Sequence, residues 1–220
     1  MYYSLYIRVR STEMSFPLFV MVLSLTNDYS ETVDGIRGDG LCSLWAVVIG
    51  FCFRFGENKI NFRQELISDQ IIQPTNIKDI LKILMSFCTF ILDNQTMLED
   101  FNYALKDESL HFKLWEIKHL IAQLTSDSIN TLQGDAHFKM LALLLNISIH
   151  VYSTETKQTF IFGKNKNAIN IQTNGAHYSL LSNHEEVYNY DFTSYWWKEQ
   201  WRGHPLNTDN TCIYVPTLTK

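Results

Sequence analysis

Apolar residues recur along this chain with two different periods, and the change between them predicts the fold class. Over 43–55, throughout 61–124 and over 136–145 they recur at the spacing of an α-helix. From 147 onward they alternate with period two, which predicts strands at hairpin distances over 147–152, 158–162, 169–172 and 177–181. Helices followed by consecutive strands indicate an α+β fold, with a mainly antiparallel sheet packed against helices.

Single residues predict where two of these helices begin and end. Gly56 is expected to end the first helix, because glycine readily adopts the backbone conformation found just beyond a helix C-terminus. Asp135 is expected to cap the helix over 136–145, because its carboxylate can accept from a free backbone N–H. The stretch 61–124 is then a helical insertion after the first helix.

The N-terminal segment predicts two strands, over 2–10 and 17–25, which could pair as a hairpin. The apolar run 16–25 follows Arg8 and Arg10, as in a signal peptide. That run is too short to cross a bilayer and has no clear small-residue cleavage site. A buried strand is therefore the preferred interpretation.

The C-terminal segment is unusually aromatic, with Tyr188, Tyr190, Phe192, Tyr195, Trp196, Trp197 and Trp201. A short helix covering the core is the first interpretation. A partner-binding surface is the second, because Trp and Tyr are effective interface anchors. Since no repeat or linker is visible, we expect a single domain over 1–220. Its core spans about 27–184, and the hairpin 1–26 and the tail 185–220 pack on it.

Composition excludes several classes of protein. The 220 residues are 46% hydrophobic and 19% charged, as in a globular domain, and the net charge of −5 provides no basic field for nucleic acid. Four widely spaced cysteines form no CxxC pair, so a reducing, cytoplasmic location is expected. No metal-ligand spacing is present among the histidines. We therefore expect a monomer with no metal, no cofactor and no membrane partner.

Cys42 carries the strongest chemical signal. It follows the turn Gly38-Asp39-Gly40 and opens an apolar helix. The free N–H groups and partial positive charge of a helix N-terminus favour a thiolate, and the same N–H groups can hold an oxyanion beside the sulfur. The alternative interpretation is a buried structural cysteine.

His177 lies far downstream, in Asn174-Gly175-Ala176-His177-Tyr178, at the start of the last predicted strand. Taken alone, it could be a hydrogen-bonded histidine of the sheet. A cysteine at a helix N-terminus together with a distant histidine forms the minimal set of a Cys–His hydrolase.

Three segments together resemble the OTU (ovarian-tumour) family of cysteine deubiquitinases, in the divergent form of bacterial effectors or viruses. Asp39-Gly40-Leu41-Cys42, with Ala46-Val47 in register, resembles the family's Asp-Gly-x-Cys motif. The segment 133–152 is similar to the family's helix beside the active site and the strand that follows. The segment 174–178 is similar to its His-Tyr/Trp strand. The three occur in the family's order over about residues 34–182.

The resemblance implies a deubiquitinase that hydrolyses isopeptide bonds at the ubiquitin C-terminus, with ubiquitin or polyubiquitin as its partner. Cys42 would be the nucleophile, His177 the base, and Asp39 the organiser of the oxyanion loop. The implied substrate contacts are Gly38, Gly40, Leu41, Ala176 and Tyr178. An effector of this kind would act in a host cytosol.

The chain departs from the family's pattern beside the histidine. Two positions after it, where the family often has Asp or Asn, stands Ser179, which has no charge to stabilise an imidazolium. The resemblance offers Asp34, eight positions before Cys42, as the third catalytic residue. Ser179 and Asn174 remain alternatives, and Asp34 could equally be a turn-forming carboxylate. A further departure is Ser43-Leu44-Trp45, where the family usually has a large apolar residue, an aromatic and an arginine.

Other classes of function stay open at this point. A catalytically inactive OTU-like module would bind ubiquitin without cutting it. A different cysteine hydrolase would act on a ubiquitin-like or other acyl substrate. A phosphate-cradling turn over 38–43 is disfavoured, because it lacks the lysine of a P-loop and any βαβ context.

Overall fold

The computed structural model describes residues 31–33, 36–63, 74–126, 132–182, 195–200 and 218–219. The predicted N-terminal strands over 2–10 and 17–25 lie outside the described residues. So do the aromatic residues 188–192 and 201 of the C-terminal segment.

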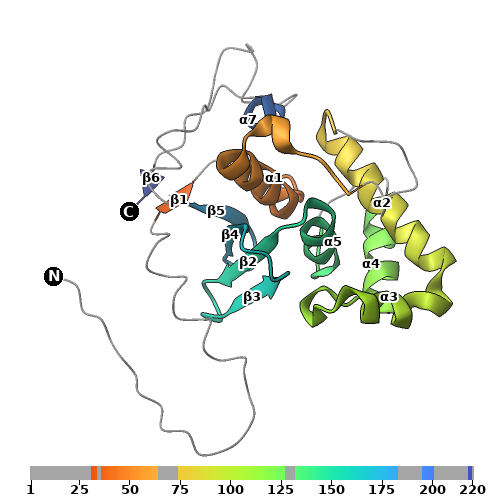
Figure 1. Cartoon of the computed structure of the whole chain (residues 1–220). Helices are drawn as coiled ribbons and strands as arrows, with labels where there is room; N and C mark the ends of the chain where they lie inside the picture. The colour runs from red at the N-terminus through yellow and green to blue at the C-terminus, as the bar shows by residue number, and fades with distance from the viewer. Residues whose placement is uncertain are drawn as a thin grey trace, which may run out of the picture.

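In the described chain a series of helices is followed by a series of consecutive strands, as the apolar pattern predicts, and Figure 1 shows their arrangement. The helices are α1 (Cys42–Phe55), α2 (Ile77–Asp93), α3 (Leu98–Leu105), α4 (Leu114–Leu124), α5 (Ala136–Leu145) and α7 (Tyr195–Gln200), with the short 3₁₀ turns η1 (Glu57–Lys59), η3 (Gln95–Met97) and η4 (Glu108–Leu110). The strands are β1 (Glu31–Val33), β2 (Ser148–Ser153), β3 (Thr159–Phe162), β4 (Ala168–Thr173), β5 (Tyr178–Ser182) and β6 (Leu218–Thr219). The α+β class is confirmed.

The sequence predicted helix throughout 61–124. This was wrong, because the described part of this stretch is interrupted between α2, α3 and α4. Asn76 begins α2 as an N-cap, its side chain accepting from the backbone N–H of Asp79 at 3.1 Å. Lys106, in a left-handed conformation with φ 55°, ends α3. Polar side chains that bond the local backbone interrupt a helix without disturbing the spacing of its apolar residues. The described part of the insertion, from residue 74 to 124, is therefore a set of separate helices.

Asp135 occupies the N-cap position of α5 but does not cap it with its side chain. Its φ of −97° and ψ of −13° are close to helical, and no side-chain cap bond forms. An effective N-cap has extended backbone, which turns its side chain toward the free N–H groups. Only the backbone oxygen of Asp135 takes part, accepting from the N–H of Lys139 at 3.0 Å.

The described strands form one sheet in the order β3-β2-β4-β5-β1-β6. The sheet is mainly antiparallel, as predicted, but β2 and β4 run parallel, with Ile149 opposite Ile169. The expected hairpin of β3 with β4 was wrong, because β3 pairs with β2 instead. The Ser148 hydroxyl contacts the carbonyls of Gly163 and Asn165 at 2.9 and 2.8 Å. These contacts fix the connection from β3 to β4 where it passes the start of β2.

Helix α1 lies directly against the sheet. Residues 42–52 are buried on every side, and Gly50 brings the helix backbone against β4 and β5. A Cβ on Gly50 would lie 2.6 Å from Ile169 Cγ2 and 2.7 Å from Leu180 Cδ1. The missing side chain thus sets how closely α1 approaches β5, the strand that directly follows His177. Gly56 ends α1 with φ 88°, as predicted.

Helix α5 joins the sheet to the helical insertion, and Figure 1 shows it between β2 and the helices α2 to α4. All ten of its residues are buried, which fits a helix that is apolar on nearly every face. Its one cation, Lys139, donates to Glu116 of α4 at 2.9 Å and to the carbonyl of His111 at 2.9 Å. Among the described helices none is long and apolar enough to cross a membrane.

Of the aromatic C-terminal segment, the structure describes the short helix α7, which packs on the core as the first interpretation expected for residues 195–200. Trp196 is buried, and Figure 1 places α7 over α1. The Glu57 carboxylate, just after α1, accepts from the backbone N–H groups of Tyr195 at 3.1 Å and Trp196 at 2.9 Å. A carboxylate at this end of a helix satisfies free donors and favours the helix dipole.

His137 of α5 is a buried histidine with no hydrogen-bond partner on either ring nitrogen among the described residues. Its ring lies against Phe138, with centroids 4.1 Å apart. Complete burial lowers the pKa of His137 to about 3. The unfolded chain, with a histidine pKa near about 6.5, then binds a proton that the folded protein does not. As the pH falls below about 6.5, His137 therefore lowers the free energy of unfolding by up to about 1.4 kcal/mol per pH unit.

We therefore predict that His137→Leu reduces the loss of thermal stability between pH 7.5 and pH 4.5, because leucine has no proton to bind. The measurement is the midpoint of thermal unfolding at each pH. His119→Gln, at an exposed site on α4, is the control and should keep the wild-type pH dependence. Equal pH dependence in wild type and His137→Leu would contradict the assignment.

Candidate active site

Cys42 is the first residue of α1, and its side chain is 6% exposed. Helix α1 has no side-chain cap and no acidic residue in its first turn. The backbone N–H groups at its start therefore have no side chain competing for them. The backbone N–H groups of Cys42 and Ser43 lie near the sulfur and lower the pKa of the thiol.

The loop before Cys42 is held in place by Asp39. Its Oδ1 accepts from the N–H of Leu41 at 3.0 Å, and its Oδ2 accepts from Nε1 of Trp45 at 3.4 Å. Arg37 Nε lies 3.3 Å from the same Oδ2. Gly40 has φ 82°, a conformation that side chains disfavour, and its carbonyl accepts from the N–H of Leu132 at 3.0 Å.

His177 directly precedes β5 and is placed by an Asn174 turn. The Asn174 side chain accepts from the N–H of Ala176 at 3.1 Å and of His177 at 2.9 Å. The Asn174 backbone N–H donates to the carbonyl of His177 at 3.3 Å. This amide therefore orients the backbone that carries the histidine, which is a different role from contacting the imidazole.

The structure brings the two halves of the predicted site together. The backbone of Tyr178, next to His177, forms a hydrogen bond with the Cys42 sulfur. A Cβ on Gly38 would lie 3.7 Å from Nδ1 of the His177 ring. The loop before the cysteine and the histidine thus lie next to each other, although 135 positions separate Cys42 from His177 along the chain.

Electrostatics at the sulfur oppose a preformed thiolate. Burial raises the pKa of the Cys42 thiol, and the nearby Asp39 carboxylate raises it further. The backbone donors from Tyr178, Ser43 and Cys42 lower it, without outweighing burial. The helix N-terminus is expected to favour a thiolate, and burial of the sulfur acts against that effect by raising the pKa of the thiol.

The remaining predicted site residues fall into different surroundings. Leu41 and Tyr178 pack against the core, and the Tyr178 ring lies 5.6 Å from the ring of Phe138. Ala176 is exposed. Ser179, paired with Gln172 of β4, lies two positions after His177 and so on the same side of the strand. Asp34 lies outside the described residues.

The sequence interpretation missed Arg37, Leu132 and Gln200 as neighbours of the cysteine loop. Arg37 is a single cation before the loop, and Gln200 lies 163 positions further along the chain. No local pattern indicates such contacts. Trp45 offered a weak signal, because it stands one helical turn after the cysteine and carries a donor.

Two other cysteines have no comparable surroundings. Burial raises the pKa of Cys88 to about 12 and raises the pKa of Cys52 still further. Cys88 contacts Met140 with its sulfur, 3.7 Å away. The described part of the chain contains no group of three or more His, Cys, Asp or Glu residues arranged to hold a metal ion.

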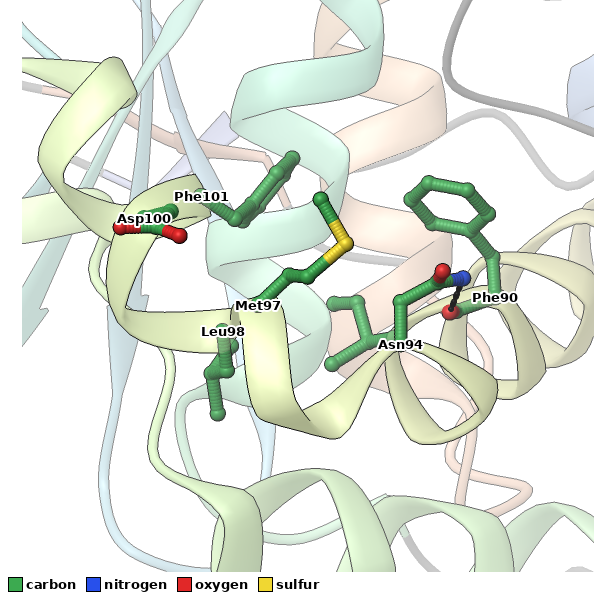
Figure 2. A pocket seen from close by; sticks show the side chains of 7 residues that line it. Phe90, Asn94, Met97, Leu98, Asp100 and Phe101 are labelled. Carbon is green, nitrogen blue, oxygen red and sulfur yellow. Dashed lines mark hydrogen bonds between the residues drawn. The ribbon is translucent and has the colours of Figure 1, made fainter.

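A cavity of about 260 Å³ lies away from this site, in the helical insertion. Figure 2 shows it where α2 ends and α3 begins, with Met97 and Phe101 at its centre and Phe90 beside it. The Asn94 side chain donates to the carbonyl of Phe90 at 2.8 Å. None of the predicted site residues lines this cavity.

Comparison with known proteins gives a likeness of fold alone. No family model and no curated protein sequence matches the chain. A solved structure described as an ovarian tumour (OTU) domain in complex with ubiquitin is similar to it, with a TM-score of 0.46 and 16% sequence identity. The likeness covers 72% of this chain and 76% of that one.

Proposed function

We propose that this chain is a cysteine hydrolase that cleaves the isopeptide bond at the C-terminus of ubiquitin. One observation supports the proposal most strongly. Cys42, at the start of an uncapped helix, receives a hydrogen bond from the residue after His177, and Gly38 of its loop lies against the His177 ring. The proposed nucleophile, Cys42, and the proposed base, His177, thus come from distant segments and lie in the same region of the fold.

In the proposed reaction the resting thiol keeps its proton, since burial raises its pKa. His177 takes that proton as the sulfur attacks the carbonyl carbon of the scissile bond. The carbon–nitrogen bond then breaks, and His177 returns the proton to the leaving amine. Water, deprotonated by His177, cleaves the thioester and releases the carboxylate and the thiol.

Backbone N–H groups at the start of α1 are the proposed oxyanion donors. The Leu41 N–H already donates to Asp39, so this group is not available. The N–H groups of Cys42 and Ser43, which lie near the sulfur, are left for the role. Asp39 acts here as the residue that shapes the loop.

Ubiquitin is proposed as the substrate from the resemblance of the three motifs to the OTU family. An extended tail ending in two glycines would pass between Gly38 and Gly40 on one side and Ala176 on the other. Glycines and alanine leave room for a close backbone approach. A free thiol nucleophile requires a reducing compartment, so we place the activity in a cytosol.

A second candidate is an inactive ubiquitin-binding module, favoured by the raised pKa of Cys42. A ubiquitin probe with a thiol-reactive C-terminus separates the two. Covalent capture at Cys42 supports the hydrolase, and binding without capture supports the module.

Cys42→Ala and His177→Ala are each predicted to lower kcat on diubiquitin by at least about 10⁴-fold, because each removes one partner of the proton transfer. The measurement is cleavage of a panel of diubiquitins. Cys52→Ala and His119→Ala are the matched controls and should cleave at the wild-type rate. Cleavage that survives in the Cys42→Ala protein would refute the nucleophile.

The third catalytic residue is tested by comparing Asp34→Asn, Ser179→Ala and Asn174→Ala. We expect Asp34→Asn to lower kcat by roughly 10²–10⁴-fold, because a carboxylate orients and stabilises the imidazolium. Asn174→Ala should lower the unfolding free energy by only about 0.5–1 kcal/mol, since both backbone donors that lose their acceptor are exposed and can bind water. If Ser179→Ala is the most impaired in kcat, the role belongs to the serine.

Gly40→Ala is predicted to lower kcat by more than about tenfold, because φ 82° becomes strained and the loop before Cys42 must move. Gly56→Ala is the matched control. Gly56 has φ 88° at the other end of α1 and open space around it, so it bears similar strain without touching the site. Equal kcat values in the two variants would argue against a constrained loop.

A further inference from the structure

The C-terminal helix α7 contacts the segment that leads into Cys42. Gln200, its last residue, is fully buried. The Gln200 side-chain oxygen accepts from the backbone N–H of Arg37 at 3.2 Å, and its backbone carbonyl accepts from Arg37 Nη1 at 2.9 Å. One residue of α7 therefore holds both the backbone and the guanidinium of Arg37.

Arg37 carries this contact on to the cysteine loop. Its Nε lies 3.3 Å from Oδ2 of Asp39. Asp39 in turn accepts from the Leu41 N–H, directly before the nucleophile, and from Trp45 of the first turn of α1. The contacts form an unbroken chain from Gln200 through Arg37 and Asp39 to the residues on either side of Cys42. All of these side chains are buried or half-buried, which limits competition from water.

The other end of α7 is fixed independently. Glu57, just after α1, caps the N–H groups of Tyr195 and Trp196, and Trp196 is 3% exposed. Helix α7 thus bridges the segment that follows α1 and the segment that precedes it, and Figure 1 shows it lying over α1. Because both of its ends are anchored, the position of Gln200 is well defined relative to the start of α1.

We propose that Gln200 and Arg37 are positioning residues for the nucleophile, and that α7 is a structural part of the active site. The inference rests on the proposed function for its effect on turnover. It concerns a segment that neither the cysteine motif nor the histidine motif includes. A misplacement of about 1 Å in an active site can cost about 10²-fold in rate, so this linkage should affect catalysis more than stability.

The test compares Gln200→Met, Gln200→Glu and Arg37→Met in the full chain. Methionine keeps the length of Gln200 but removes its acceptor. Glutamate keeps an oxygen acceptor at the same place. It lacks Nε2, but Nε2 of Gln200 has no hydrogen-bond partner among the described residues, so this loss removes no bond. Lys198→Met, on the exposed side of α7, is the control.

Two readouts are taken beside the midpoint of thermal unfolding. One is kcat and KM on diubiquitin. The other is the pH dependence of alkylation by iodoacetamide, followed at Cys42 by peptide mass spectrometry, which needs no ubiquitin substrate. Gln200→Met should lower kcat by roughly tenfold or more with KM nearly unchanged, and Gln200→Glu should restore it. Arg37→Met should move the alkylation midpoint to higher pH, because the unpaired Asp39 carboxylate then opposes the thiolate more strongly.

The proposal is overturned if Gln200→Met and Arg37→Met keep the wild-type kcat and alkylation profile. It is also overturned if each loss of kcat is explained by a smaller folded fraction of the variant and Gln200→Glu does not restore kcat. The two proposals fail separately. If the wild type cleaves no ubiquitin conjugate while Arg37→Met still shifts the alkylation profile, the proposed substrate is wrong and the positioning role stands.

Discussion

The contact between the start of α1 and the start of β5 is the constraint on which the rest of the site depends. The hydrogen bond from Tyr178 to the Cys42 sulfur brings a helix end and a strand end to one place. Gly50 makes this possible, because any side chain there would push α1 away from Ile169 and Leu180. Cys42 begins a helix and His177 directly precedes a strand, so both are held by rigid elements. This suits an active site whose atoms must keep their positions within fractions of an ångström.

Burial at this contact has an electrostatic consequence. A sulfur packed between a helix and a sheet loses solvation, and that loss outweighs the backbone donors around it. A buried thiol of this kind depends on a base for activation. His177 is therefore central to the proposed chemistry, and Gly38 of the cysteine loop lies beside its ring.

The peripheral elements act on the site in different ways. Helix α7 reaches the cysteine loop through Arg37 and Asp39. The helical insertion is joined to α5 by the pair Lys139–Glu116, and α5 packs beneath the site through Phe138 and Tyr178. The insertion also holds the cavity at Met97 and Phe101, apart from the cysteine. The insertion is thus connected to the site through the packing of α5, whereas α7 makes direct polar contacts to the cysteine loop.

The α+β class, the limits of α1 and α5, and the positions of β2 to β5 could be predicted from the amino-acid sequence, because apolar period and local backbone preference act over a few residues. It singled out Cys42 and His177 by residue type and context. Three features became visible only in the folded protein: β2 and β4 run parallel, Gln200 holds Arg37, and burial raises the pKa of Cys42. Strand order, contacts across 163 positions and desolvation all depend on which segments meet, and no local pattern encodes that.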